Sequence, residues 1–240
     1  MMNPEIIYQD ENTMVLDKPA GWIVNEADTT TKQPVVQKWL KDNFKYPIVN
    51  SKLLRSGIVH RLDKETSGVL LVAKTKNAFE NLQAQFKERE VEKKYVALVH
   101  GRVEPKEGTI EVPVGRLPWR RDRFGVLPGG REATTGYKAI RYYDSKEAKF
   151  TFLELAPKTG RTHQIRIHLK YIGHPIVGDE FYAGRKTARN DRKWCTRLFL
   201  HASQISFFHP ESNQKVTFST NIPSGLKKAL NVLEKLRESS

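Results

Sequence analysis

The sequence predicts an α+β fold built on a mixed, mainly antiparallel central β-sheet with flanking helices and loops. Short runs rich in β-branched and aromatic residues recur along the chain, each about as long as one strand and bounded by turn residues. Neighbouring runs are often joined without a helix between them, and strands connected in this way pair antiparallel. A few segments instead carry apolar residues at helical spacing, so helices are expected to pack around the sheet.

The first half of the chain alternates strand and helix patterns. Residues 6–16 are expected to form two strands about a turn at 10–12, and Lys-Pro-Ala-Gly at 18–21 stops the second. Residues 68–74 and 95–99 are continuous apolar runs typical of buried strands. The two helices expected between these strands are predicted from their apolar residues, which are Val35, Val36, Trp39 and Leu40 in one and Phe79, Leu82 and Phe86 in the other.

The second half is richer in strand patterns. Ile165, Leu169 and Ile172 mark one face of a short helix, which Gly173 and Pro175 terminate. A final helix begins at the capping residue Ser224, and leucines at 226, 230, 233 and 236 lie on one side of it. The expected strands of this half are 108–114, 133–143, 149–155, 198–208 and 215–219.

Length and composition predict one domain spanning residues 1–240. The 240 residues are ample for one domain and too few for two full-sized ones. The single cysteine, Cys195, excludes an internal disulfide and a cysteine-rich zinc site. The first twenty residues lack the apolar core of a signal peptide, and no run approaches the roughly 20 apolar residues that cross a bilayer. We therefore expect a soluble cytoplasmic protein without a membrane partner.

The charge of the chain predicts a polyanionic partner. The formal net charge is +14, and nucleic acids are the commonest cytosolic polyanions. Residues 116–131 hold five arginines against one aspartate, a net of +4, with Trp119 and Phe124 between them. Residues 183–197 hold six basic residues against one aspartate, a net of +5. Basic side chains for phosphates and aromatic rings for unpaired bases are typical of RNA-binding proteins, although each segment alone also fits a solvated charged loop.

Two polar segments are candidates for a site. Residues 60–68 form a polar loop that leads into a buried strand, and loops held by rigid strands often carry catalytic groups. Residues 158–168 form a cationic loop that enters a helix, whose first-turn N–H groups favour an anion such as phosphate. Composition alone favours an ordinary surface turn for both.

Taken together, the two segments carry a family resemblance. The chain resembles the RluA-like RNA pseudouridine synthases in five ordered blocks, which are Lys-Pro-Ala-Gly at 18–21, Arg-Leu-Asp followed by Thr-Ser-Gly within 61–68, Lys-Lys-Tyr-Val-Ala-Leu-Val-His-Gly at 93–101, Gly-Arg-Thr-His-Gln-Ile-Arg at 160–166 and Gly-His-Pro-Ile-Val-Gly-Asp at 173–179. The resemblance implies the pseudouridine synthase catalytic fold. It also implies a chain that begins at the catalytic domain, without the N-terminal RNA-binding domain of many relatives.

The resemblance implies roles for individual residues. Asp63 matches the catalytic nucleophile, Tyr95 the tyrosine that stacks on the target uracil, and Arg166 the basic residue that pairs with the catalytic aspartate. Asn25 departs from the pattern, because relatives often have a histidine there. The residues expected to contact RNA are Arg61, which helps fill the gap left by the flipped nucleotide, and Arg161, His163, Arg120, Arg121 and Arg123.

The chemistry of pseudouridine formation suits these residue types. Uracil is detached from ribose C1′, turned and rejoined through C5, with no atom gained and no redox step, so no cofactor and no metal are expected. The reaction needs an ionised carboxylate that acts as a nucleophile, as in retaining glycosidases, and an adjacent arginine favours that charged form. Flipping the base costs a few kcal/mol, and stacking on Tyr95 offsets about 1–3 kcal/mol. Attack by Asp63 at C1′, attack at C6 and elimination to a glycal all remain open.

Two other functions fit parts of the sequence. A metal-dependent or acid/base phosphodiesterase would use His60, Asp63, His163 and His168. However, the last two are five residues apart and do not share a helix face as an i, i+4 metal pair does. A non-catalytic RNA-binding or assembly factor on the same scaffold is disfavoured, because Asp63, Tyr95 and Arg166 are all present. The sequence does not distinguish ribosomal from transfer RNA as substrate, and a monomer is expected.

Overall fold

The chain folds into two compact units. The computed structural model describes residues 2–27, 30, 32–120, 123–144 and 148–238. Unit 1 contains residues 1–93 and 202–220, and unit 2 contains residues 94–201 and 221–240. The chain passes between the units three times, and two of these passages lie inside the strands β4 (Glu92–His100) and β10 (Leu200–Phe208).

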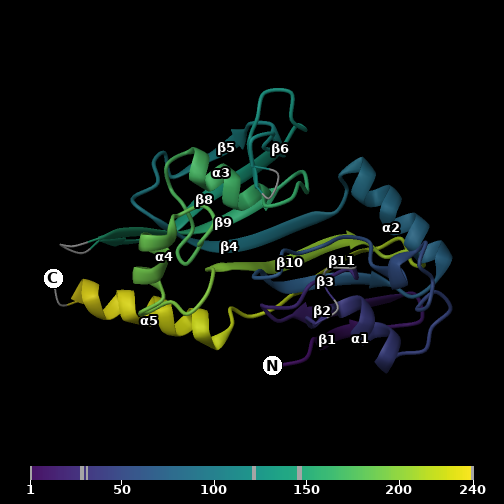
Figure 1. The fold of residues 1–240 in the computed structure, drawn as a ribbon. Coiled ribbons are helices and arrows are strands. Elements are labelled where there is room, and N and C mark those ends of the chain that lie inside the picture. Colours follow the sequence, from purple (N-terminus) through teal and green to yellow (C-terminus); the bar gives the residue numbers. More distant parts are fainter. Residues whose placement is uncertain (1, 28–29, 31, 121–122, 145–147, 239–240) are drawn as a thin grey trace. The chain divides into compact units, whose positions relative to one another are not determined.

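Unit 1 is built on antiparallel pairs of strands with two α-helices. Strand β2 pairs with β1 on one side and with β3 on the other, and β11 pairs with β10. The order of these strands is β1-β2-β3-β10, with β11 joined to β10 (Figure 1). The elements are β1 (Glu5–Gln9), β2 (Thr13–Lys18), α1 (Val36–Asn43), the 3₁₀ helix η2 (Arg55–Gly57), β3 (Ser67–Ala73), α2 (Lys76–Glu88) and β11 (Lys215–Ser219).

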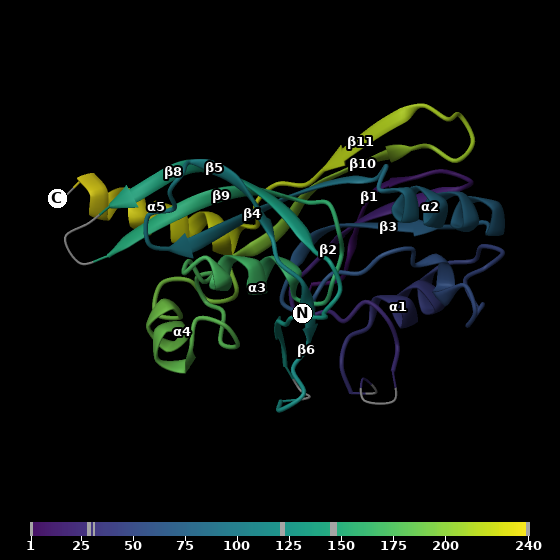
Figure 2. The same ribbon diagram turned by 90° about the horizontal axis from the view of Figure 1, so that it is seen from above.

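In its described residues, unit 2 holds four consecutive antiparallel strands, a separate hairpin and three helices. The strand order is β4-β9-β8-β5, while β6 pairs with β7 in a separate small sheet. Helix α5 lies beside β8, where Arg141 forms an ion pair with Glu234 (Figure 2). The elements are β5 (Glu107–Glu111), β6 (Val114–Arg116), β7 (Phe124–Val126), β8 (Thr134–Asp144), β9 (Lys149–Pro157), α3 (Gln164–Tyr171), α4 (Arg185–Asp191) and α5 (Ser224–Glu238).

Strand β3 is the centre of the core of unit 1 and leads directly out of the 60–68 loop. All seven of its residues are buried, which explains its uninterrupted apolar sequence. Thr75 caps the N-terminus of the helix that follows, because its side chain accepts a hydrogen bond from the Ala78 N–H at 3.2 Å. Gln85 of the same helix bonds both backbone groups of Phe208, at 2.6 and 2.9 Å. The strand that carries the loop is therefore fixed on several sides.

The α+β class and the mainly antiparallel sheet are confirmed, but three local elements differ from the prediction. The predicted strand 108–114 is two strands, because the pairing of β5 ends at Glu111 and Pro113 has no N–H to continue a ladder. Strand β7 and helix α4 were not predicted. Leu226 and Leu233 of the last helix are buried, whereas Leu230 is only half-buried, and the side chain of Leu236 lies outside the described residues.

In the part of the chain that is described, no helix has the length and apolarity needed to cross a membrane.

We expect Gly68→Ala to destabilise the protein by about 3–5 kcal/mol. Gly68 has φ +117°, and a Cβ there would lie 2.1 Å from the carbonyl oxygen of Ala202, so a side chain is strained and also meets backbone. Denaturant unfolding measures the loss. Gly160→Ala is the matched control, because a Cβ at that position would meet no atom within 4 Å, and a comparable loss in that variant would contradict the explanation.

Candidate active site

His60 begins the loop that carries Asp63 and is a structural residue. Its Nε2 accepts a hydrogen bond from the Leu71 N–H at 2.9 Å, so the ring proton is on Nδ1. The ring stacks on Phe86 with centroids 5.1 Å apart. Burial and the nearby charge of Lys93 lower the pKa of His60 to about 3, so the ring is neutral at physiological pH. This arrangement fixes the start of the loop and leaves Nε2 unavailable for acid/base work.

The opening Lys-Pro-Ala-Gly block holds the other end of the same loop. The buried Lys18 ammonium donates to the carbonyl oxygens of Pro19 and Trp22, at 3.0 and 2.9 Å, and to that of Lys64 at 3.3 Å. The Lys64 carbonyl also accepts from the Gly21 N–H at 2.8 Å. A buried cation without such acceptors would be costly, so the lysine and the loop constrain each other.

Asp63 sits between these two attachments. Its side chain is half-buried, and its carbonyl oxygen accepts from the Thr66 N–H at 3.1 Å, which closes a turn. The preceding Leu62 is buried, whereas Arg61 is exposed. The backbone of the loop is therefore held both before and after Asp63.

In unit 2, Arg166 lies on α3 and forms a buried ion pair. Its Nε and Nη2 donate to the two carboxylate oxygens of Asp179, each at 2.8 Å, and the two residues are 5% and 1% exposed. The rings of Tyr182 and Phe181 lie 5.1 and 5.5 Å from the guanidinium carbon. Asp179 also accepts from the backbone N–H groups of these two aromatic residues, at 3.1 and 3.0 Å. The sequence did not indicate this carboxylate partner.

Gln164 fixes the loop before α3. Its Oε1 accepts from the Thr159 hydroxyl at 2.7 Å and from the Arg161 N–H at 3.0 Å. Its Nε2 donates to the Thr134 carbonyl at 3.0 Å and to the Thr135 hydroxyl at 2.9 Å. The buried amide is thus fully hydrogen-bonded and ties the Gly-Arg-Thr-His-Gln block to β8.

His163 is held in an unusual backbone conformation at the start of α3. Its φ of 56° is left-handed, which non-glycine residues rarely adopt and which often marks functional sites. The Tyr182 hydroxyl donates to the Phe124 carbonyl at 3.2 Å, so His163 Nδ1 is the donor in its 2.9 Å bond to that hydroxyl. Arg161 donates to the Glu132 carbonyl at 3.1 Å.

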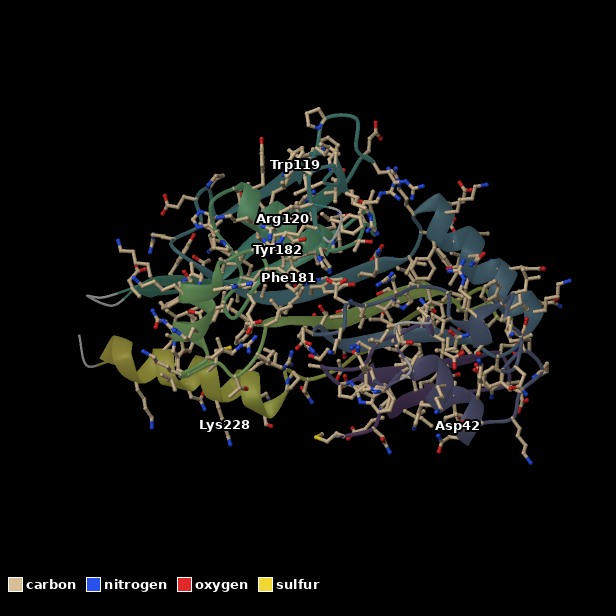
Figure 3. The ribbon with its side chains drawn as sticks, viewed as in Figure 1. Asp42, Trp119, Arg120, Phe181, Tyr182 and Lys228 are labelled. Carbon is tan, nitrogen blue, oxygen red and sulfur yellow. The ribbon has the colours of Figure 1, made fainter. Side chains whose placement is uncertain are left out.

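The arginines predicted to bind RNA in the 116–131 segment differ in their environment. Arg120 and its neighbour Trp119 are exposed, the latter by 71% (Figure 3). Arg123 is half-buried, donates to the Phe181 carbonyl at 3.1 Å and lies 5.6 Å from the ring centroid of the same residue. Arg121 lies outside the described residues. Arg123 therefore joins the β6–β7 hairpin to the loop that carries Asp179.

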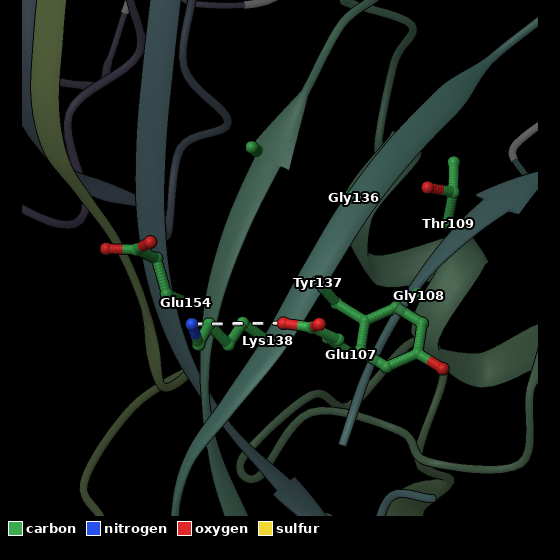
Figure 4. A pocket seen from close by; sticks show the side chains of 8 residues that line it. Glu107, Gly108, Thr109, Gly136, Tyr137, Lys138 and Glu154 are labelled. Carbon is green, nitrogen blue, oxygen red and sulfur yellow. Dashed lines mark ion pairs between the residues drawn. The ribbon is translucent and has the colours of Figure 1, made fainter. Parts of the chain in front are cut away.

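Tyr95 lies on β4 opposite Leu155 of β9 and is mostly buried. A cavity of about 400 Å³ lies elsewhere in unit 2, lined by residues that include Lys138, Glu154 and Gly136 (Figure 4). Lys138 and Glu154 are paired across strands, in the register next to Leu155, so their side chains project from the opposite face of the sheet. Tyr95 does not belong to the residues that line this cavity.

Two of the three histidines of the phosphodiesterase alternative, His168 and His60, make structural contacts. His168 is fully buried, its Nε2 lies 3.2 Å from the Val112 carbonyl, and burial lowers its pKa. His60 is equally engaged, through Leu71 and Phe86. Among the described residues, no group of three His, Cys, Asp or Glu side chains is placed to hold a metal ion.

Comparison with known proteins identifies the family. Residues 12–171 match the family model described as RNA pseudouridylate synthase. The chain belongs to this family. It is 36% identical over 234 residues to an uncharacterized RNA pseudouridine synthase, YlyB, of Bacillus subtilis, with 98% of this chain and 74% of that protein covered. It is 35% identical over 239 residues to ribosomal large subunit pseudouridine synthase D of Nitrosomonas europaea, with 98% of this chain and 67% of that protein covered.

A solved structure gives the same result. The structure of human RNA pseudouridylate synthase domain containing 1 superposes with a TM-score of 0.73 at 26% identity, covering 99% of this chain and 96% of that one. The predicted membership and fold class are confirmed, and the protein is an RNA pseudouridine synthase, an isomerase acting on RNA. Of the supporting residues, Lys18, Gln164 and Asp179 lie inside the motif blocks, and the sequence signalled their positions but not their contacts.

We expect acid to destabilise the wild type more than a His60→Gln variant. Because the folded-state pKa of His60 is about 3 and the unfolded-state value is about 6.5, the unfolded chain takes up a proton that the folded protein does not, so stability falls as pH drops below 6.5. Between pH 7 and pH 5 the wild type should lose about 2 kcal/mol more than the variant. Urea unfolding at both pH values measures this difference, and equal losses would show that His60 is protonated in the folded state.

Proposed function

We propose that this synthase isomerises specific uridines of ribosomal or transfer RNA, with Asp63 as the nucleophile. The proposal depends on the environment of Asp63. This half-buried carboxylate lies on a loop that Lys18 fixes at one end and His60 at the other. A nucleophile held in this way needs little reorganisation when the substrate arrives. The loop lies within the matched family region, residues 12–171.

In this proposal Arg166 supports the carboxylate and Tyr95 receives the base. Arg166 has little freedom, because Asp179 holds it at two nitrogen atoms. A guanidinium held in one orientation suits the role that the family resemblance implies, the support of the catalytic carboxylate. Tyr95 supplies a flat ring on which a flipped uracil stacks, and this offsets part of the cost of unstacking. We propose that residues 1–240 act as one catalytic domain, as the sequence predicts.

The reaction balances without a further reactant. The C1′–N1 bond breaks, the base turns, a C1′–C5 bond forms, the proton on C5 leaves and N1 gains one. Attack of Asp63 at C1′, attack at C6 and elimination to a glycal each require the same carboxylate in the same place. The proposal therefore concerns the residue and leaves the route open.

The proposed RNA contacts come from the two loops, 60–68 and 158–168, and from the segment 116–131. Arg61 is exposed beside Asp63, and Arg120 is exposed on the β6–β7 hairpin. Arg161, His163, Arg121 and Arg123 complete the proposed set, although Arg123 already contacts Phe181. We propose a monomeric, cytoplasmic enzyme, in keeping with the formal charge of +14 and the cellular location of these RNA classes.

The decisive test is release of tritium from RNA labelled at uracil C5, because bond formation at that carbon expels its hydrogen. We expect the wild type to release tritium and Asp63→Asn to be slower by at least about 10³-fold. Asp42→Asn is the matched control, since it makes the same change at an exposed position on α1 and should leave the rate unchanged (Figure 3). Normal release by Asp63→Asn would exclude Asp63 as nucleophile, and release by none of the proteins from either RNA class would favour a binding or assembly role.

We expect Tyr95→Phe to retain substrate affinity and Tyr95→Leu to lose it. Phenylalanine keeps the aromatic face, whereas leucine has none, and base stacking contributes about 1–3 kcal/mol, or roughly 5- to 150-fold in affinity. Filter binding of the same RNA, with denaturant unfolding of each variant to correct for weaker packing, measures the effect. Equal affinities for the two variants would contradict a stacking role.

A further inference from the structure

Helix α4 and the turn after it present a strongly basic surface that the proposed catalytic set does not use. Its exposed cations are Arg185, Lys186, Arg189, Arg192 and Lys193, and we refer to these five residues as the α4 basic surface. In the part of the chain that the structure describes, Arg192 pairs with Glu180 at 3.1 Å, while the other four have no carboxylate partner. These four charges, which lack a carboxylate partner among the described residues, are available to an anionic ligand.

Asp191 attaches helix α4 to the rest of unit 2. Asp191 is buried, and its Oδ2 accepts from the Gly178 N–H at 2.8 Å and lies 3.0 Å from His100 Nε2. Its carbonyl oxygen accepts from the Cys195 N–H at 2.7 Å. The single acidic residue of the helix is thus turned inward, and the charges that face solvent are all positive.

The point of attachment is next to the residue that holds Arg166. Gly178 precedes Asp179, whose carboxylate forms the bidentate pair with the guanidinium of Arg166. Gly178 has φ +77°, and a Cβ there would lie 2.5 Å from the carbonyl oxygen of Arg197, so this backbone has one tightly packed conformation. The α4 basic surface is therefore held in a fixed position relative to Arg166.

The shape and composition of this surface fit a phosphate backbone. Helix α4 is about 9 Å long at a rise of about 1.5 Å per residue, and Arg192 and Lys193 in the following turn extend the row of charges, which is longer than a single phosphate requires. The surface exposes no large apolar side chain of its own, since Ala188 is buried and Trp194 is half-buried, so it lacks the apolar face that inserts into a lipid surface. Arginine and lysine in a row are typical of contacts to nucleic-acid phosphates.

We propose that the α4 basic surface binds backbone phosphates of the substrate RNA at a distance from the uridine that is modified. The proposal rests on the function proposed above and adds a binding site to it. Its contacts are independent of the base, so it contributes affinity and orientation to any RNA that the enzyme modifies. Removing these charges weakens RNA binding and leaves the turnover of bound RNA unchanged.

The test compares two double variants that remove the same charge. Arg189→Gln with Lys193→Gln changes the α4 basic surface, and Lys227→Gln with Lys228→Gln changes exposed residues of α5 (Figure 3). The probe is large-subunit ribosomal RNA transcribed in vitro with tritium at uracil C5. Filter binding over a range of salt concentrations and tritium release at saturating RNA are measured for both variants and the wild type.

The α4 variant should bind at least fivefold more weakly than the α5 variant at moderate salt. The slope of log K against log salt should become shallower by about 0.7–0.9 for each phosphate that the variant no longer neutralises, and kcat should stay within twofold of the wild type. Equal affinity and equal slope in the two variants would overturn the proposal. A wild type that binds this RNA but releases no tritium would count against the proposed function alone, because the binding comparison does not depend on turnover.

Discussion

The buried ion pair between Arg166 and Asp179 is the interaction on which the organisation of unit 2 depends. Two charges that are 5% and 1% exposed are almost completely removed from water, and such charges are tolerated only when paired and hydrogen-bonded. Asp179 satisfies this condition with two bonds to the guanidinium and two to backbone N–H groups. The loop from 178 to 182 must therefore keep one conformation.

That loop also joins the parts of unit 2 that carry its positive charge. Phe181 and Tyr182 connect it to the β6–β7 hairpin, through Arg123 and the Phe124 carbonyl. Gly178 and Glu180 connect it to α4, through Asp191 and Arg192. In unit 1 the buried ammonium of Lys18 has a comparable role, because its need for carbonyl acceptors shapes the loop that carries Asp63. In both units a buried charge fixes a polar loop.

The sequence predicted what depends on local pattern and missed what depends on distant partners. Strand β3 was predicted because burial on both faces requires an unbroken apolar run. Helix α4 was missed because a seven-residue helix with the single apolar residue Ala188 has no periodicity. The motif blocks indicated Asp63, Tyr95 and Arg166, but the bond between Arg166 and Asp179 joins residues thirteen positions apart and depends on the path of the loop. The structural role of His60 became visible only with its acceptor contact and its burial.

The division of strands β4 and β10 between the units has an evolutionary consequence. Each unit consists of two separate stretches of sequence, and the chain leaves one unit for the other in the middle of a strand. Genes recombine by exchanging continuous segments, and any continuous segment that encodes one unit completely also encodes residues of the other. Neither unit can be transferred to another protein by simple domain shuffling. A recombination event that moves one unit whole must therefore also move part of the other.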